Sequence, residues 1–154
     1  MLSYFRLSMH PNTHPIPYLL SSASKTGGSD HGELADKQSG GKQHELWQRL
    51  LLHIERERPY LRPLLMQADL AETLGVSTRT LCRIVTQYSP DNFNTFINRY
   101  RVEEACRLMR DPRYGDLSVE MIAHQAGFNS RGSFYRAFKH IKGTSPAQYR
   151  HGQP

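Results

Sequence analysis

The sequence predicts an all-α fold, and three observations support this prediction. From His44 onward, apolar residues recur every three or four positions, as they do along one face of an α-helix. Glycine or proline residues end these stretches. Apolar and polar residues do not alternate as they do in a half-buried strand, and the β-branched residues are scattered, so no strand is predicted.

Six helices are predicted, each ended by a glycine or by a pair that contains proline. The first has an apolar face made of Leu46, Trp47, Leu50, Leu51 and Ile54, and ends at Pro59. We interpret Trp47 as packing within its own domain; the alternative is a dimer face. The fourth and longest has the stripe Phe93, Phe96, Ile97, Tyr100, Ala105, Leu108 and Met109. The predicted ranges are about 44–58, 67–74, 78–87, 91–110, 119–126 and 131–141.

Residues 1–43 differ from the rest of the chain. They are rich in proline, glycine and serine and show no apolar periodicity, so they cannot bury enough surface to offset the entropy of ordering. We expect them to be mostly disordered and place the folded domain at 44–151. The N-terminal segment has four Lys and Arg against three Asp and Glu, and the remainder has 16 against 11. The positive charge therefore belongs to the folded part.

Composition favours an intracellular protein with an anionic partner. The net charge of +6 and pI of about 9.5 favour nucleic acid first and an anionic membrane second; a merely soluble basic protein is the plain alternative. No apolar run approaches the length of a membrane span, and the first residues do not form a secretory signal. The two cysteines, Cys82 and Cys106, imply no disulfide framework. We expect a cytoplasmic location.

An internal repeat relates the second and third helices to the fifth and sixth. Ala71 and Gly75 recur as Ala123 and Gly127, 52 residues later. In each copy the small alanine lets a second helix approach closely, and the glycine permits the turn between crossing helices. Apolar residues are placed to fill the angle between the helices of each copy: Val76 and Leu81 in the first, Phe128 and Phe134 in the second. The repeat therefore predicts two helix-turn-helix units joined by the long helix.

The trailing helix of each unit carries arginines near its beginning, at Arg79 and Arg83 and again at Arg131 and Arg136. The planar guanidinium matches the edge of guanine or a phosphate, and a solvated basic face is the plain alternative. A long helix of about 20 residues spans roughly 30 Å, close to the 34–36 Å of one turn of DNA. One chain is therefore expected to place two helices in successive major grooves.

The residues from about His44 to Arg150 resemble the DNA-binding domain of AraC/XylS-type regulators. The motifs are residues 127–139 (GFNSRGSFYRAFK), 143–150 (GTSPAQYR), 74–81 (LGVSTRTL) and parts of 92–105 (NFNTFINRYRVEEA). The resemblance implies a multihelical, homeodomain-like fold with two helix-turn-helix subdomains and a linker helix. It also implies a regulator of transcription that binds double-stranded DNA and contacts RNA polymerase.

By this resemblance, particular side chains contact DNA. The implied base contacts are Arg79, Cys82, Arg83, Arg131, Gly132 and Arg136. The implied phosphate or flanking contacts are Thr78, Thr80, Ser133, Tyr135 and Lys139. A phosphate contact raises affinity for every sequence, whereas a base contact discriminates between sequences.

The sequence departs from the family pattern in three places. Met66 stands where the family commonly has a capping threonine, and a lost cap costs about 1 kcal/mol. Gly132 stands where a side chain is usual, and it lowers helix propensity by up to ~1 kcal/mol. Residues 1–43 are too short and too polar for the sensor domain that most relatives carry; a naturally small regulator, a truncated product and a fragment all remain open.

Other kinds of site find little support. The eight histidines do not form a cluster with the spacing of metal ligands, and no catalytic constellation or cofactor motif is present. We therefore expect no enzyme activity, cofactor, metal or small-molecule site. Cys82 beside Arg83 is read as a small residue facing the groove or core; a redox-sensitive thiol is the alternative. The competing function is a sensor-less protein-interaction module that acts on a related regulator or on RNA polymerase.

Overall fold

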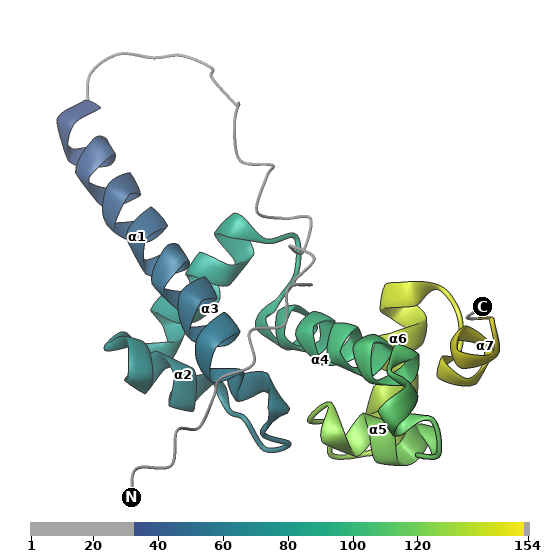
Figure 1. The fold of residues 1–154 in the computed structure, drawn as a ribbon. Coiled ribbons are helices and arrows are strands. Elements are labelled where there is room, and N and C mark those ends of the chain that lie inside the picture. Colours follow the sequence, from purple (N-terminus) through teal and green to yellow (C-terminus); the bar gives the residue numbers. More distant parts are fainter. Residues whose placement is uncertain (1–32, 153–154) are drawn as a thin grey trace, which may run out of the picture. The chain divides into compact units, whose positions relative to one another are not determined.

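The computed structural model describes residues 33–152, and over that range the protein is all-helical, as predicted (Figure 1). No helix in the described part is long and apolar enough to cross a bilayer. The α-helices and the two 3-10 helices, marked η, follow in chain order: α1 (Glu33–Glu57), η2 (Pro59–Leu61), α2 (Gln67–Leu74), α3 (Thr78–Tyr88), α4 (Phe93–Arg110), η3 (Pro112–Tyr114), α5 (Val119–Gln125), α6 (Arg131–Lys142) and α7 (Pro146–His151).

Helix α1 begins at Glu33, whereas the sequence predicted a helix from His44 and disorder over 1–43. For residues 33–43 that prediction was wrong, and residues 1–32 lie outside the described part. Residues 33–38 are mostly good helix formers but have no apolar stripe, so periodicity gave no signal there. Once the later turns of α1 are docked, extending the helix requires no new nucleus, which offsets the cost of Gly40 and Gly41.

The first helix-turn-helix unit is built on a core that α1 covers. Its predicted apolar face is buried throughout, and Leu50 and Ile54 are fully enclosed. The Trp47 ring is 6% exposed and lies 5.6 Å from the Tyr88 ring and 5.5 Å from the Phe96 ring, centroid to centroid. The interpretation that Trp47 packs within its own domain is therefore confirmed.

Within this unit, α2 and α3 are joined by the predicted turn. Gly75 has φ +69°, a left-handed conformation that favours glycine. Ser77 caps α3, because its hydroxyl accepts from the Thr80 N–H at 3.1 Å. Met66 provides no side-chain cap for α2, but Asp69 Oδ2 accepts from the Met66 N–H at 2.8 Å. This bond satisfies the N–H of Met66 itself, whereas a serine or threonine cap would accept an N–H of the first turn of α2.

The second unit repeats this plan around a core that contains three phenylalanine rings. Phe134 and Phe138 are fully buried, and Phe128 is 3% exposed. Ser118 caps α5 by accepting from the Met121 N–H at 3.1 Å. Helix α7 was not among the six predicted helices; Ser145 and Gln148 cap it reciprocally. Its Tyr149 ring packs 5.4 Å from the Phe138 ring, and Arg150 donates to the Leu117 and Gly115 carbonyls.

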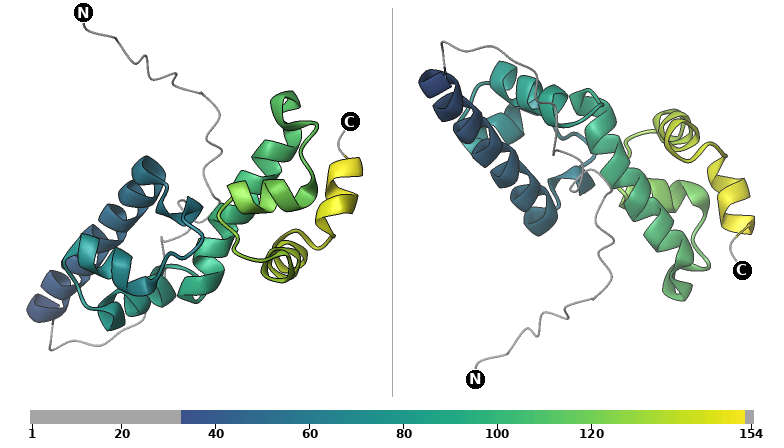
Figure 2. Two further views of the ribbon diagram at one scale, coloured as in Figure 1. Left: turned by 90° about the horizontal axis from the view of Figure 1, so that it is seen from below. Right: turned by 90° about the horizontal axis from the view of Figure 1, so that it is seen from above.

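The long helix α4 belongs to both units and connects them (Figures 1 and 2). Its first half buries Phe93, Phe96 and Ile97 in the core of the first unit. Its second half buries Val102, Ala105, Cys106 and Leu108 in the core of the second. The two cores share no buried residue. From Ile97 to Val102 the helix turns about 140° beyond one full turn, so the units pack on different faces of α4.

Glu104 is a buried carboxylate of α4, 7% exposed, that holds two arginines. Its oxygens accept from Arg107 Nε at 3.0 Å and Nη2 at 2.8 Å, and also from Arg58 Nη2. Burial would raise the pKa of Glu104, but the hydrogen bonds and charges of Arg107 and Arg58 outweigh it and lower that pKa. Because Arg58 follows α1 directly, the cluster fastens the end of that helix to α4.

Replacing Glu104 by Gln should lower the free energy of unfolding at pH 7 by about 1.5–3 kcal/mol, the usual worth of hydrogen bonds to charged groups. A carboxyl with a lowered pKa stabilises the fold above its unfolded pKa, near 4.5, and loses that contribution as pH falls through the folded pKa. In urea titrations, the gap between wild type and Glu104→Gln should therefore narrow as the pH falls below about 4.5 and close once the pH lies below the folded pKa of Glu104.

Glu103→Gln is the matched control for this experiment. Glu103 is the neighbouring carboxylate and pairs with Lys142 at 2.5 Å, but its side chain is 45% exposed. An exposed pair contributes about 0–1 kcal/mol. Equal losses for the two variants, or a gap that persists in acid, would contradict the role given to Glu104.

Candidate nucleic-acid interface

Helices α3 and α6 are equivalent in register as well as in sequence order. Each begins after a serine cap, Ser77 or Ser130, whose hydroxyl accepts the N–H three residues later. The fourth and eighth helical residues are buried in both: Leu81 and Val85 in α3, and Phe134 and Phe138 in α6. Position by position, therefore, Arg79 corresponds to Gly132 and Arg83 corresponds to Arg136.

The two arginines of α3 lie on the exposed side of the helix. Arg79 and Arg83 are four residues apart, which places them on one face, and both are exposed. Neither side chain makes an ion pair or a hydrogen bond within residues 33–152. Their guanidinium groups are therefore available to an external anion or to a base edge.

The other predicted residues of α3 have local partners. Thr78 is exposed, and the half-buried Thr80 shares a hydroxyl contact of 2.9 Å with Ser77. The Cys82 thiol is half-buried and donates to Gln67 Oε1 of α2 at 3.3 Å. Cys82 therefore contacts the preceding helix, which agrees with the interpretation that it is a small residue packed beside the core.

In α6 the two predicted arginines differ. Arg136 is exposed and lies in a groove of about 270 Å³ between α4 and α6, which Ser133 and Asn98 also line. Arg131 is already engaged, because its Nε lies 3.3 Å from Glu120 Oε1 and its guanidinium lies 5.1 Å from the centre of the Tyr135 ring. Sequence reasoning missed Glu120, an acidic residue in the first turn of α5.

Gly132 leaves an open position on α6 where α3 has Arg79. A Cβ built there would meet only Arg136 Nη1, at 3.9 Å. Ser133 and Lys139 are exposed, and Ser133 is held by Ser130 through both its N–H and its hydroxyl. Within residues 33–152, α6 therefore has one arginine without a side-chain partner, Arg136, whereas α3 has two.

Both helices are basic. Helix α3 contains two arginines, and neither helix contains an aspartate or glutamate. The basic residues of α6 are Arg131, Arg136, Lys139 and Lys142, of which Lys142 is paired with Glu103 of α4. Local charge of one sign on an exposed helix attracts a polyanion and raises the rate of association.

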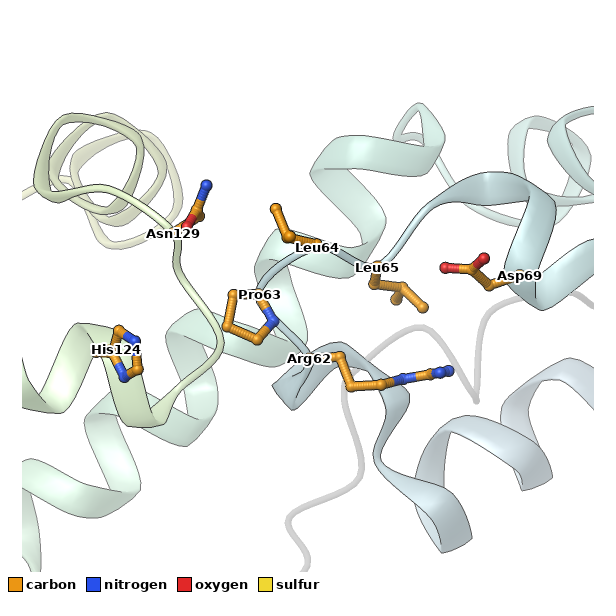
Figure 3. Close-up of a pocket in the computed structure, with 7 residues that line it drawn as sticks. All are labelled: Arg62, Pro63, Leu64, Leu65, Asp69, His124 and Asn129. Atoms are coloured by element: carbon orange, nitrogen blue, oxygen red, sulfur yellow. The ribbon is translucent and has the colours of Figure 1, made fainter.

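An open pocket of about 410 Å³ lies beside these helices (Figure 3). Pro63 and Leu64, from the loop before α2, face His124 and Asn129 of the second unit across it. Leu64 is 73% exposed. None of the residues predicted to contact DNA lines the pocket. Within residues 33–152, no three His, Cys, Asp or Glu side chains gather as a metal site requires.

Comparison with known proteins agrees with this geometry. The family described as "Helix-turn-helix domain" matches residues 70–152, more than half of the chain. An uncharacterised HTH-type transcriptional regulator of Staphylococcus aureus is 37% identical over 87 residues, which are 56% of this chain and 11% of that protein. A protein named as an AraC-like transcription regulator from Streptomyces lividans is 34% identical over 83 residues, 54% of this chain and 26% of the relative.

A solved structure shows the same likeness. The C-terminal domain of AraT, a response regulator from Geobacillus stearothermophilus, aligns with a TM-score of 0.56 and 27% identity. The alignment covers 72% of this chain and 84% of that one. The chain thus spans about a tenth to a quarter of the length of the sequence relatives named above, and 84% of the AraT C-terminal domain. It belongs to the AraC-type helix-turn-helix family of transcription regulators.

Proposed function

We propose that this protein regulates transcription by binding a specific DNA sequence, with residues 44–151 as the DNA-binding domain. In this proposal α3 and α6 enter successive major grooves on one face of the duplex, and the bound protein acts on RNA polymerase. The observation that carries the proposal is a pair of exposed arginines, Arg83 and Arg136, at equivalent places on two capped, basic helices, with Arg79 one turn before Arg83; none of the three has a side-chain partner within residues 33–152.

The length of α4 supports this arrangement. Its 18 residues span about 27 Å, somewhat less than the 30 Å expected from the sequence. Because α3 and α6 pack on opposite halves of α4, side chains that project from them extend this reach towards the 34–36 Å of one helical turn of DNA. The half-motifs are therefore expected about one turn apart.

The test is selection from a library of duplexes with a random tract of about 30 base pairs, long enough for more than two helical turns. Purified wild type at near-physiological salt should enrich two short motifs about one turn apart. The double variant Arg83→Ala, Arg136→Ala should enrich neither, while Arg56→Ala, at an exposed arginine of α1, should behave as wild type.

Failure of the wild type to enrich any sequence would contradict the proposal. A wild type that binds DNA only weakly and without preference, but binds RNA polymerase, would favour the protein-interaction module instead. Enrichment of a single motif would show that only one unit reads bases, and Gly132 would then be the first position to examine.

A further inference from the structure

One set of contacts between the two helix-turn-helix units lies around the Tyr60 carbonyl. We call this set the seam; it consists of Tyr60, Leu61, Arg62, Arg101, Gly127 and Phe128. The first three belong to the segment that follows α1, the last two belong to the turn between α5 and α6, and Arg101 is on α4 between them.

Arg101 bonds to the first unit and stacks on the second. Its Nε donates to the Tyr60 carbonyl at 2.7 Å, and its Nη2 donates to the Arg62 carbonyl at 2.9 Å. Its guanidinium carbon lies 5.8 Å from the centre of the buried Phe128 ring. One side chain therefore satisfies two backbone carbonyls of the first unit while it covers a core residue of the second.

Gly127 brings the second unit against the same carbonyl. A Cβ at this position would overlap the Tyr60 carbonyl oxygen and would lie 2.9 Å from Leu61 Cα and 3.0 Å from the Leu61 carbonyl carbon. Only glycine permits this approach. The Tyr60 carbonyl is thus the point at which Arg101 and both units come together.

Outside the seam, the units are connected by α4, whose two halves lie in separate cores, and by the ion pair of Arg58 with Glu104 on its second half. A helix alone leaves freedom in bending and in the packing of each unit against it. We propose that Arg101 is a positioning residue: through the seam it fixes the distance and rotation between α3 and α6, and so determines the half-site spacing that the protein accepts. This inference rests on the proposed function for its consequence on DNA.

The substitution Arg101→Lys tests the role of side-chain geometry separately from the role of charge. A lysine ammonium is a compact point charge, whereas the guanidinium is a planar fork that bonds in two directions and stacks on a ring. Arg101→Lys should therefore keep the charge and most of the packing while it loses the bridge. Arg110→Lys is the matched control, because Arg110 is on the same helix and, within the described part of the chain, its hydrogen bond is to the Cys106 carbonyl of that helix.

The first measurement needs no DNA. Residual dipolar couplings of backbone amides report the orientation of each unit in a weakly aligned sample of the full chain. Wild type and Arg110→Lys should fit one alignment tensor for both units. Arg101→Lys should require two different tensors, with each unit still fitting well by itself, which shows that both remain folded.

The second measurement uses the duplex selected above and versions with the two motifs moved one or two base pairs closer or farther apart. One base pair rotates a half-site by roughly 35° about the duplex axis. Wild type should lose about tenfold or more in affinity per shift, as for a mismatched site. Arg101→Lys should change by less than about threefold across the series, from a weaker optimum.

The outcomes separate this inference from the proposed function. A common tensor in Arg101→Lys, or a spacing profile identical to that of wild type, overturns the role of Arg101. If the wild type requires two different alignment tensors, the seam does not fix the orientation of the two units, and the inference is overturned. A rigid wild type that loosens in Arg101→Lys but selects no DNA supports the seam and overturns the proposed function.

Discussion

Substituting Ala for Gly127 is expected to cost about 2–5 kcal/mol of unfolding free energy, the largest stability effect of a single methyl group that we expect in this chain. Gly127 has φ +89°, and holding another residue in a left-handed conformation costs about 1–2 kcal/mol. The added Cβ also overlaps the backbone of Tyr60 and Leu61, and overpacking costs about 1–3 kcal/mol. Chemical denaturation followed by circular dichroism measures the difference.

Gly75→Ala is the control, because Gly75 occupies the position in the first unit that Gly127 occupies in the second. Gly75 has φ +69°, but a Cβ there meets no atom within 4 Å. The substitution should therefore cost only the conformational part, about 1–2 kcal/mol. If the two variants lose the same stability, the close approach at the seam makes no contribution, and the turn conformation alone explains both glycines.

Arg83→Ala should weaken binding to the selected duplex by roughly 5- to 150-fold, which corresponds to the 1–3 kcal/mol of a good bidentate base contact. Arg79→Ala and Arg136→Ala should fall in the same range, because these side chains also have no partner in the described part of the chain. Arg131→Ala should lose less, since the Glu120 carboxylate and the Tyr135 ring already engage its guanidinium. Titrations at fixed salt measure each dissociation constant.

Lys139→Ala distinguishes base reading from charge. Lys139 is exposed on α6, and a phosphate contact there should weaken binding to all duplexes alike and lower the salt slope by about 1. The arginine variants should instead lose discrimination at particular base pairs. If Arg83→Ala weakened binding equally to matched and mismatched duplexes, Arg83 would be a phosphate contact and its assignment to a base would be wrong.

The fold was predictable where a helical apolar stripe was followed by a glycine or proline that ends the helix. The stripe of Leu46, Leu50 and Ile54 placed the first core, and the repeated Ala and Gly positions placed both turns. The beginning of α1 was missed because residues 33–43 have no stripe and contain two glycines. Helix α7 was missed because six residues carry no periodicity, although Ser145 followed by Pro146 is a capping signal.

Of the candidate site, the sequence could predict only which side chains are exposed, because helical spacing determines which residues face solvent. Spacing placed Arg79, Arg83 and Arg136 on the surface. It gave no sign of the Glu120 partner of Arg131, because that contact joins two helices whose crossing depends on tertiary packing. The sequence also could not predict the hydrogen bonds that Arg101 donates to the Tyr60 and Arg62 carbonyls. Every residue has a backbone carbonyl oxygen, so no sequence pattern indicates which residue accepts such a bond.

The buried face of α4 changes between Ile97 and Val102, so this helix sets the rotation between the two units as well as the distance between them. Each residue inserted between these two positions would turn the second unit by about 100° and move it by about 1.5 Å along the helix axis. Gly127 would then leave the Tyr60 carbonyl. A change in chain length within residues 98–101 would therefore put α3 and α6 out of phase with successive major grooves, even if every contact within each unit were kept.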